Sequence, residues 1–357
     1  MGQNQSHPQG PLMKIAVAMS GGVDSSVTAA ILQKEGHEVF GLTMLVTPSD
    51  EAAVAAREAA AALAIPHHTV DFRDIFNREV IAGFCLQYSL GRTPNPCVNC
   101  NRLIKFGILL EKARELGAAA MATGHYACIE KQPDTGRMVL KKGVDRTRDQ
   151  SYFLYKLTQP QLASVVFPLG NMTKANVRKI ASEMGLASVK RKESREICFV
   201  PDNDYPRFLR EHLSAVPEGR IVDKQGKVLG HHAGIVNYTV GQRKGLGISS
   251  KEPLYVVGID AQNNTVIVGE KQDVYADEFI AADLNWIAVD NITRTLSLKV
   301  KIRYLHQEAE AIISAVDSDK VNVKFKSPQM AVTPGQAAVF YDGDVVVGGG
   351  TIERVLN

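Results

Sequence analysis

The sequence predicts an α/β fold, with a doubly wound, mostly parallel sheet followed by one or two small β domains that include a barrel. In the first half of the chain, short apolar strands alternate with helices, a pattern typical of a parallel sheet covered by helices. After about residue 205, short segments rich in β-branched and aromatic residues are separated by turns such as Asn263-Asn264 and Asp342-Gly343. This second pattern is typical of small β domains.

The expected elements follow this division. In the first half, strands are expected over residues 14–19, 38–44, 68–72 and 119–122. Helices are expected over 25–34, 52–63, 75–88, 105–116 and 175–184, several of them ended by Gly or Pro. In the second half, strands are expected over 255–259, 265–268, 296–302, 321–325 and 337–341.

Composition narrows the class of protein. The chain has 357 residues, of which 45% are hydrophobic and 22% charged, so we expect a globular protein of two or three domains, not a disordered or fibrous one. No apolar run reaches the roughly 18 residues of a membrane span. Residues 1–12 are polar and are expected to form a disordered tail, not a secretory signal. Five cysteines are too few for a secreted disulfide framework, which favours a cytoplasmic protein with reduced thiols.

A glycine-rich loop joins the first expected strand to the first helix, with the sequence Ser20-Gly21-Gly22-Val23-Asp24-Ser25-Ser26. Glycines let backbone N–H groups approach phosphate oxygens, and a helix N-terminus favours an anion. The loop lacks the GK[ST] of a loop built for γ-phosphate transfer. It resembles the pyrophosphate loop of ATP pyrophosphatases, in which Asp24 would lie near Mg²⁺. The alternative is an ordinary Gly-rich turn with a helix cap.

Cys97 and Cys100 form a CxxC pair, and Cys198 follows a basic stretch at 190–192. A following helix N-terminus favours the thiolate form of the pair, and the nearby cations favour the thiolate form of Cys198. A thiolate is both a nucleophile and a metal ligand. The pair alone is compatible with a redox pair, half of a metal site, or coincidence. Cys85 and Cys128 lie in apolar contexts and are expected to be inert.

Eight blocks in order resemble the bacterial tRNA-specific 2-thiouridylase family, which makes 2-thiouridine at the anticodon wobble position. They are AMSGGVDSS (18–26), GRTPNPCVNCN (91–101), ATGHYA (122–127), DQSYFLY (149–155), EICF (196–199), YTVGQRKGLGI (238–248), KIRY (301–304) and VTPGQAAVFYDG (332–343). The resemblance implies an ATP pyrophosphatase catalytic domain over 13–205, a small central tRNA-contacting domain over 206–273 and a C-terminal β-barrel over 274–357.

The same resemblance implies roles for individual residues. The expected ATP-binding residues are Ala18, Met19, Ser20, Gly21, Gly22, Val23, Asp24, Ser25, Met44 and Gly124. The expected tRNA-binding residues are Asn95, Pro96, Cys97, His125, Asp149, Gln150, Ser151, Arg303, Tyr304 and Gln336. Cys100 matches the family's nucleophile, and Cys198 matches its persulfide-bearing cysteine.

Cys97 departs from the family pattern, because many relatives have an aspartate there that is a candidate acid or base. With Cys97, three thiols could hold an iron–sulfur cluster with one open iron. The competing mechanism carries a persulfide on Cys198, with Cys100 resolving it as a disulfide. The cysteine count does not choose between the two, so Cys97, Cys100 and Cys198 are all candidate catalytic residues.

The expected activity uses ATP, with Mg²⁺, to turn the wobble uridine C2 oxygen into an adenylate, which sulfur then displaces. The expected partners are the tRNA anticodon stem-loop and a sulfur donor, which could be a cysteine desulfurase, a sulfur relay protein or free sulfide. Basic residues suit an RNA backbone or are solvated surface charges; they include Lys141, Lys142, Arg146, Arg148, Lys174, Arg178 and Lys179.

Two other functions fit parts of the sequence. One is a small-molecule adenylating ligase or amidotransferase with the same loop. The other is a non-catalytic RNA-binding or sulfur-carrier protein. The thiouridylase interpretation requires the nucleotide loop and the thiols at 97, 100 and 198 to open onto one cavity.

Overall fold

The computed structural model describes residues 12–186 and 197–356. The chain divides into two compact units, each with its own hydrophobic core. The first comprises Met1–Asn77 and Cys100–Arg195, and the second comprises Arg78–Asn99 and Glu196–Asn357. The chain therefore passes from one unit to the other between Asn99 and Cys100, inside the CxxC pair.

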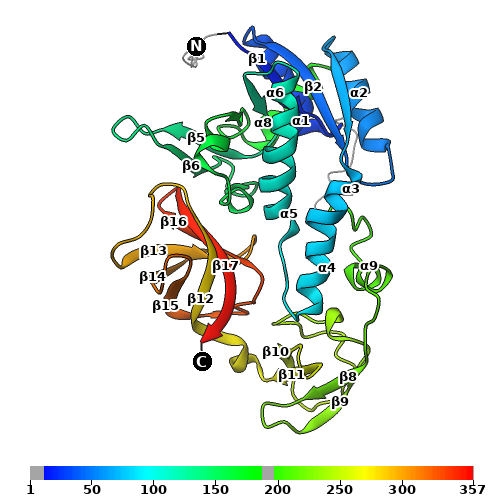
Figure 1. The fold of residues 1–357 in the computed structure, drawn as a ribbon, viewed down its shortest axis with the longest axis vertical. Coiled ribbons are helices and arrows are strands. Elements are labelled where there is room, and N and C mark those ends of the chain that lie inside the picture. The colour runs from blue at the N-terminus through cyan, green and yellow to red at the C-terminus, as the bar shows by residue number, and fades with distance from the viewer. Residues whose placement is uncertain (1–11, 187–196, 357) are drawn as a thin grey trace. The chain divides into compact units, whose positions relative to one another are not determined.

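The first unit contains a five-stranded sheet in the order β3-β2-β1-β4-β7, with every pair parallel. Figure 1 labels two of its strands, β1 and β2. Its strands are β1 (Lys14–Ala18), β2 (Glu38–Leu45), β3 (His67–Asp71), β4 (Ala120–Ala122) and β7 (Val165–Val166). The chain builds outward from β1 to β3, then returns to the other side of β1 with β4. The neighbouring loops after β1 and β4 therefore form a topological switch point, where ligands bind in open α/β sheets.

Helices cover both faces of this sheet, which confirms the doubly wound α/β prediction. Ile15 and Val17 share a core with side chains of α1, α2 and α8, whereas Ala16 points to the opposite face and is also fully buried. The helices of this unit are α1 (Val23–Lys34), α2 (Glu51–Ala62), α3 (Arg73–Phe76), α6 (Leu109–Glu115), α7 (Gln159–Leu162), α8 (Lys174–Glu183) and the 3₁₀ turn η3 (Ser151–Phe153). An antiparallel hairpin of β5 (Ala127–Lys131) and β6 (Met138–Lys142) follows β4.

The helix predicted over 105–116 begins earlier than the sequence indicated. Helical structure starts at α5 (Pro96–Asn99), continues through a π-helix η2 (Cys100–Ile108) and ends with α6. Proline suits the first turn of a helix, because an N–H at that position would have no acceptor within the helix. The cysteine pair thus lies inside helical structure, where the sequence analysis expected the approach to a helix. The helix predicted over 75–88 is similarly composite, with α3, a π-helix η1 (Asn77–Ile81) and α4 (Ala82–Ser89).

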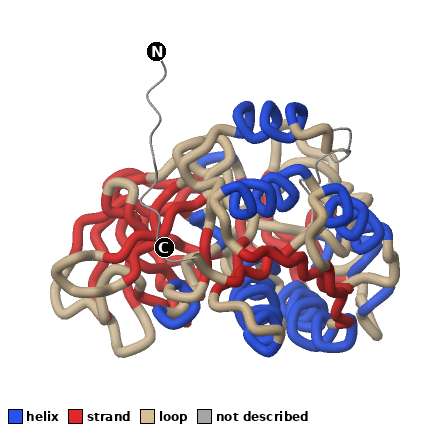
Figure 2. The backbone as a smooth tube through the Cα atoms, turned by 90° about the horizontal axis from the view of Figure 1, so that it is seen from above, coloured by secondary structure: helices blue, strands red, loops and turns tan. Residues whose placement is uncertain are grey.

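The second unit contains a closed antiparallel barrel, which confirms the predicted C-terminal β-barrel. Its strands pair in the order β12-β15-β14-β13-β16-β17, and a β12–β17 pairing closes the barrel. They are β12 (Tyr275–Trp286), β13 (Leu296–Lys301), β14 (Ala309–Ala315), β15 (Val321–Met330), β16 (Ala337–Asp342) and β17 (Val345–Leu356). Figure 2 shows this strand-rich region in red.

The rest of the second unit contains a smaller sheet in the order β10-β11-β8-β9. Its strands are β8 (Gly219–Val222), β9 (Val228–His232), β10 (Tyr255–Asp260) and β11 (Thr265–Gly269). The unit also contains α4, α5, α9 (Tyr205–His212) and the 3₁₀ turns η5 (Ile235–Asn237) and η6 (Lys271–Val274). The sequence analysis predicted β10 and β11 but missed the pair β8 and β9.

Candidate functional site

The nucleotide loop leaves β1 after Ala18 and enters α1 at Val23. Gly21 has a φ of +72°, and a Cβ added there would lie 2.3 Å from the Cβ of Ala55, so the position requires glycine. The Ser20 N–H donates to Ser25 Oγ at 3.2 Å, and Ser25 Oγ is 3.2 Å from its acceptor, the Gly22 carbonyl. Gly22, the residue before α1, has no side chain to cap the first N–H groups of the helix, and such N–H groups bind anions.

The loops after β1 and β4 are in direct contact at the switch point. A Cβ added to Gly124 would lie 2.8 Å from the Cβ of Asp24 and 3.0 Å from the Ser25 nitrogen. Met44 lies near the carboxyl end of β2, the strand that pairs with β1. The structure therefore brings the predicted ATP-binding residues from three strands to one edge of the sheet.

Asp24 is held by two residues that the sequence analysis did not select for this site. The Tyr126 hydroxyl donates to Asp24 Oδ1 at 2.7 Å, and Lys174 Nζ lies 2.8 Å from both Asp24 oxygens. The side chain of Lys174 is 8% exposed, whereas that of Asp24 is 33% exposed. The sequence analysis grouped Lys174 with basic residues for an RNA backbone or the surface. It could not pair Lys174 with Asp24, because the two residues are 150 positions apart in the sequence.

His125 lies next to this loop in a largely aromatic environment. Its Nδ1 is 2.6 Å from Thr123 Oγ1, and its ring centroid lies 5.7 Å from that of Phe106 and 5.6 Å from that of Phe167. Burial, reinforced by the charge of Lys105, lowers the pKa of His125 well below its ordinary value. The imidazole is therefore neutral at physiological pH, suited to hydrogen bonding but not to pairing with a phosphate.

The predicted tRNA-binding triplet 149–151 has mainly internal contacts. Asp149 Oδ1 accepts hydrogen bonds from the N–H groups of Gly143 and Ser151, each at 3.1 Å, and Oδ2 accepts from Ser151 Oγ at 2.9 Å. Gln150 Oε1 accepts from the Tyr126 N–H at 3.0 Å. These contacts fix the shape of the loop, and its contact with tRNA stays a prediction.

In the second unit, a segment of the barrel anchors the chain that leads to Cys97. The Thr93 N–H donates to the Pro334 carbonyl at 2.9 Å, and Gln336 Nε2 donates to the Thr93 carbonyl at 2.8 Å. A Cβ added to Gly335 would lie 3.0 Å from Thr93 N. The exposed Cys97 follows four residues after Thr93, so the predicted residues Asn95, Pro96 and Gln336 belong to one connected structure.

The other two barrel residues predicted to contact tRNA lie after β13. One Arg303 terminal nitrogen donates to the Met330 carbonyl at 2.8 Å, and Lys301 Nζ lies 5.7 Å from the centre of the Tyr304 ring. These contacts fix the loop that carries both side chains. Their contact with tRNA stays a prediction.

Cys198 is exposed beside a buried anchor. The ring of the next residue, Phe199, lies 5.4 Å from that of Phe84 and 5.3 Å from that of Phe208, between centroids. This cluster fixes the backbone next to the exposed Cys198. The basic stretch at 190–192, expected to favour the Cys198 thiolate, lies outside the described residues.

Cys100 is the first residue of η2 and is 7% exposed, unlike Cys97 and Cys198. The following Asn101 is also buried; its Nδ2 donates to the Phe153 carbonyl at 3.1 Å, but its Oδ1 has no partner in the described part of the chain. A buried acceptor without a donor costs about 1–3 kcal/mol. Asn101 lies in the π-helix η2, and π-helical turns often occur at functional sites. The sequence analysis did not select Asn101 as a candidate site residue.

The iron–sulfur expectation finds no support among residues 12–186 and 197–356. They contain no group of three His, Cys, Asp or Glu side chains arranged to hold a metal ion. Cys97 and Cys198 belong to the second unit and Cys100 to the first. Convergence of the three sulfurs on the nucleotide loop stays a prediction.

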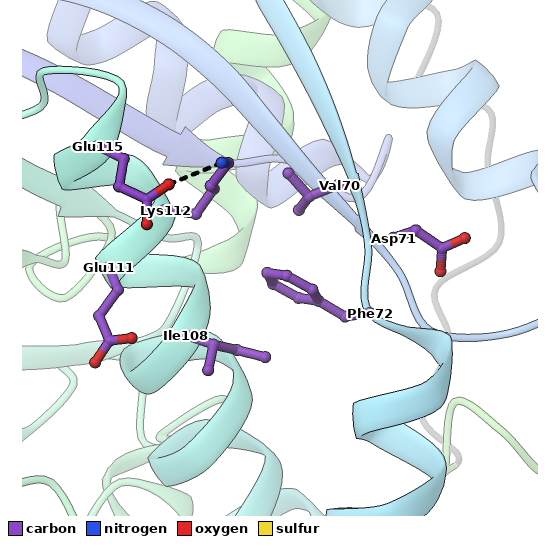
Figure 3. A pocket seen from close by; sticks show the side chains of 7 residues that line it. All are labelled: Val70, Asp71, Phe72, Ile108, Glu111, Lys112 and Glu115. Carbon is purple, nitrogen blue, oxygen red and sulfur yellow. Dashed lines mark hydrogen bonds and ion pairs between the residues drawn. The ribbon is translucent and has the colours of Figure 1, made fainter.

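A separate pocket of about 420 Å³ lies in the first unit (Figure 3). It is lined by Val70, Asp71, Phe72, Ile108, Glu111, Lys112 and Glu115. Three carboxylates line it, and Lys112 is paired with Glu115 at 2.8 Å. This lining does not suit the phosphates of a nucleotide, and none of the predicted ATP-binding residues belongs to it.

Three family models match consecutive parts of the chain. The tRNA methyl transferase HUP domain matches residues 13–202, the tRNA methyl transferase PRC-barrel domain matches 206–270, and the aminomethyltransferase β-barrel domain matches 276–352. Together with the Gly-rich loop at the switch point, these matches define a class of nucleotide-using, tRNA-modifying enzymes.

Full-length relatives identify the family within this class. A tRNA-specific 2-thiouridylase of Caldanaerobacter subterraneus subsp. tengcongensis is 50% identical over 96% of this chain and 98% of the relative. Another, from Geobacter metallireducens, is 50% identical over 96% of this chain and 97% of the relative. The chain belongs to the tRNA-specific 2-thiouridylase family.

A solved structure described as a 4-thiouridine synthetase–RNA complex with bound ATP is 19% identical to this chain. The matched region covers 56% of this chain and 51% of the chain in that structure, with a TM-score of 0.38. This similarity is too weak to carry a conclusion. Among the described residues, no helix has the length and apolar character needed to cross a membrane.

Proposed function

We propose that the chain catalyses ATP-dependent 2-thiolation of the wobble uridine in the tRNA anticodon. The observation that carries the proposal is the Gly21-Gly22 loop, which opens an uncapped helix at the switch point of a chain with full-length thiouridylase relatives. The loop lacks the lysine of γ-phosphate transfer. It resembles the pyrophosphate loop of ATP pyrophosphatases, and this resemblance implies cleavage between the α- and β-phosphates.

The first step activates a poor electrophile. The uridine C2 carbonyl oxygen bonds to the α-phosphorus of ATP, the bond from that phosphorus to the bridging oxygen breaks, and pyrophosphate leaves. The N–H groups at the start of α1 stabilise the charge on the departing pyrophosphate. Asp24 would supply oxygen ligands of the kind that Mg²⁺ prefers, and a bound Mg²⁺ would neutralise phosphate charge.

The second step transfers sulfur. The terminal sulfur of a persulfide on Cys198 attacks C2, and AMP leaves with the former carbonyl oxygen. The Cys100 thiolate then attacks Cys198 Sγ, breaks the S–S bond, and leaves 2-thiouridine and a Cys100–Cys198 disulfide. A thiol reductant resets the enzyme, and a cysteine desulfurase or a sulfur relay protein then transfers the outer sulfur of its own persulfide to the Cys198 thiolate. Free sulfide would act without that reductant: it would attack Cys198 Sγ of the Cys100–Cys198 disulfide, break the S–S bond, and give the Cys198 persulfide and the Cys100 thiolate. The exposure of Cys198 suits loading by a donor, and the burial of Cys100 protects the resolving thiol.

The role of Cys97 separates this route from the iron–sulfur alternative. We propose the persulfide route, because an exposed Cys198 and a buried Cys100 suit the two different roles that this route requires. Anaerobic purification, followed by iron and acid-labile sulfide analysis, tests the choice. The persulfide route predicts an iron-free enzyme that thiolates tRNA, whereas cluster loss together with loss of thiolation in Cys97→Ala would contradict it.

The overall proposal is tested with an unmodified tRNA, ATP, Mg²⁺ and a sulfur source. We expect 2-thiouridine in the digested tRNA, with AMP and pyrophosphate in equal amounts. Asp24→Asn should lower the rate by at least about 100-fold, whereas Asp134→Asn, which alters an exposed hairpin residue, should not. Pyrophosphate release that needs a small acceptor and not tRNA would instead support a small-molecule ligase or amidotransferase. Full activity of Asp24→Asn would also contradict the proposal.

A further inference from the structure

The charge balance of the nucleotide loop requires a cation that the loop itself does not contain. Ser20–Ser26 carries one charged residue, Asp24, and it is negative. A carboxylate repels the phosphates that an uncapped helix N-terminus attracts. A bound Mg²⁺ would offset part of this negative charge, and a cationic side chain from elsewhere in the chain would offset more.

Lys174 brings that charge to the loop. Its ammonium lies 2.8 Å from each oxygen of Asp24, and its side chain is 8% exposed. The Lys174 N–H donates to Asp145 Oδ2 at 2.9 Å, which fixes the first residue of α8. The Tyr126 ring lies 5.9 Å from Lys174 Nζ, and its hydroxyl binds the same carboxylate. The lysine is thus positioned from its backbone to its tip.

We propose that Lys174 is the phosphate-contacting cation of this site, in place of the lysine that other nucleotide loops carry within the loop. This assignment rests on the proposed function, because it requires a nucleotide at the loop. When ATP binds, the ammonium of Lys174 turns from Asp24 toward the phosphate oxygens. Asp24 keeps the hydrogen bond from Tyr126, which holds the carboxylate in place during the exchange.

The alternative role for Lys174 is purely structural, as the partner that keeps Asp24 in position. Ligands with and without phosphate separate the two roles. A phosphate contact affects ATP and pyrophosphate but not adenosine, whereas a collapsed loop affects all three. The test therefore measures binding of ATP, pyrophosphate and adenosine by calorimetry or competition, with Mg²⁺ and without tRNA.

We expect Lys174→Met to weaken ATP and pyrophosphate binding by roughly 10–100-fold, the range of a hydrogen bond to a charged group. Adenosine affinity should change by less than about twofold. Lys174→Arg should restore part of the loss, because it keeps the charge. Lys179→Met, an exposed lysine on the same helix, should bind all three ligands like the unmodified chain.

Asp24→Asn and Asp24→Asn/Lys174→Met provide a second comparison that leaves no unpaired carboxylate behind. A phosphate contact predicts that the double variant binds ATP roughly 10–100-fold more weakly than Asp24→Asn. Equal affinities of these two variants would overturn the proposal, as would wild-type ATP binding by Lys174→Met or an equal loss of adenosine. Because these assays contain no tRNA, failure to make 2-thiouridine would contradict the proposed function without bearing on Lys174.

Discussion

Gly124→Ala tests the contact between the loops after β1 and β4. A Cβ at this position would lie 2.8 Å from the Asp24 Cβ and 2.9 Å from the Asp24 carbonyl carbon, whereas ordinary contact begins at 3.4 Å. The obstacles include backbone, so the nucleotide loop itself must move by several tenths of an ångström. Overpacking of this kind costs about 1–3 kcal/mol in the free energy of unfolding. A displaced loop also misaligns the α-phosphate, so we expect adenylation to slow by about tenfold.

Gly83→Ala is the matched control, because a Cβ added there has no atom within 4 Å. Gly83 lies inside α4, where alanine stabilises a helix by about 0.5–1 kcal/mol relative to glycine. Thermal unfolding followed by ATP titration should show lower stability and weaker binding for Gly124→Ala only. If Gly124→Ala kept both the stability and the ATP affinity of the unmodified chain, the loop contact would not be as close as described.

Three further predictions concern the surroundings of the site. Phe199→Ala removes a buried ring and should lower the free energy of unfolding by about 3–5 kcal/mol. The rate of 2-thiouridine formation should fall more than the rate of pyrophosphate release. An equal fall in both rates would contradict an anchoring role for Phe199 beside Cys198. Asp149→Asn leaves one acceptor oxygen for three hydrogen bonds and should lose about 1–3 kcal/mol in urea unfolding, whereas unchanged stability would show that the carboxylate is not needed. Because the folded-state pKa of His125 is depressed, the unfolded chain binds the extra proton, so stability should fall as pH drops below about 6.5. His125→Gln should reduce that slope by up to about 1.4 kcal/mol per pH unit, and an unaltered slope would assign the loss to other groups.

The sequence predicted the nucleotide loop because its signals are local. A buried strand, two glycines and a following helix are neighbours in the chain, and the structure confirms the strand, the turn and the helix at Lys14–Ala18, 19–22 and Val23–Lys34. The mostly parallel sheet followed from the same alternation of short strands and helices. The barrel followed from repeated β-branched segments, and its closure was implied by the family resemblance.

Contacts between distant residues were not predictable from one sequence. The Lys174–Asp24 ion pair joins the starts of two helices that pack together only in the folded unit. The early start of the helix at Pro96 was missed because prolines usually mark helix ends, although they also suit the first turn. The internal bonds of Asp149 were missed because nothing in DQSYFLY indicates which polar side chains turn inward.

The central claim is that the uridine C2 oxygen leaves as part of AMP. A tRNA carrying ¹⁸O at C2 of the wobble uridine, incubated with ATP and a sulfur source, tests it directly by mass spectrometry of the products. The account predicts one ¹⁸O in each AMP and none in pyrophosphate. Label in inorganic phosphate accompanied by ADP, or label lost to water with unlabelled AMP, would contradict it.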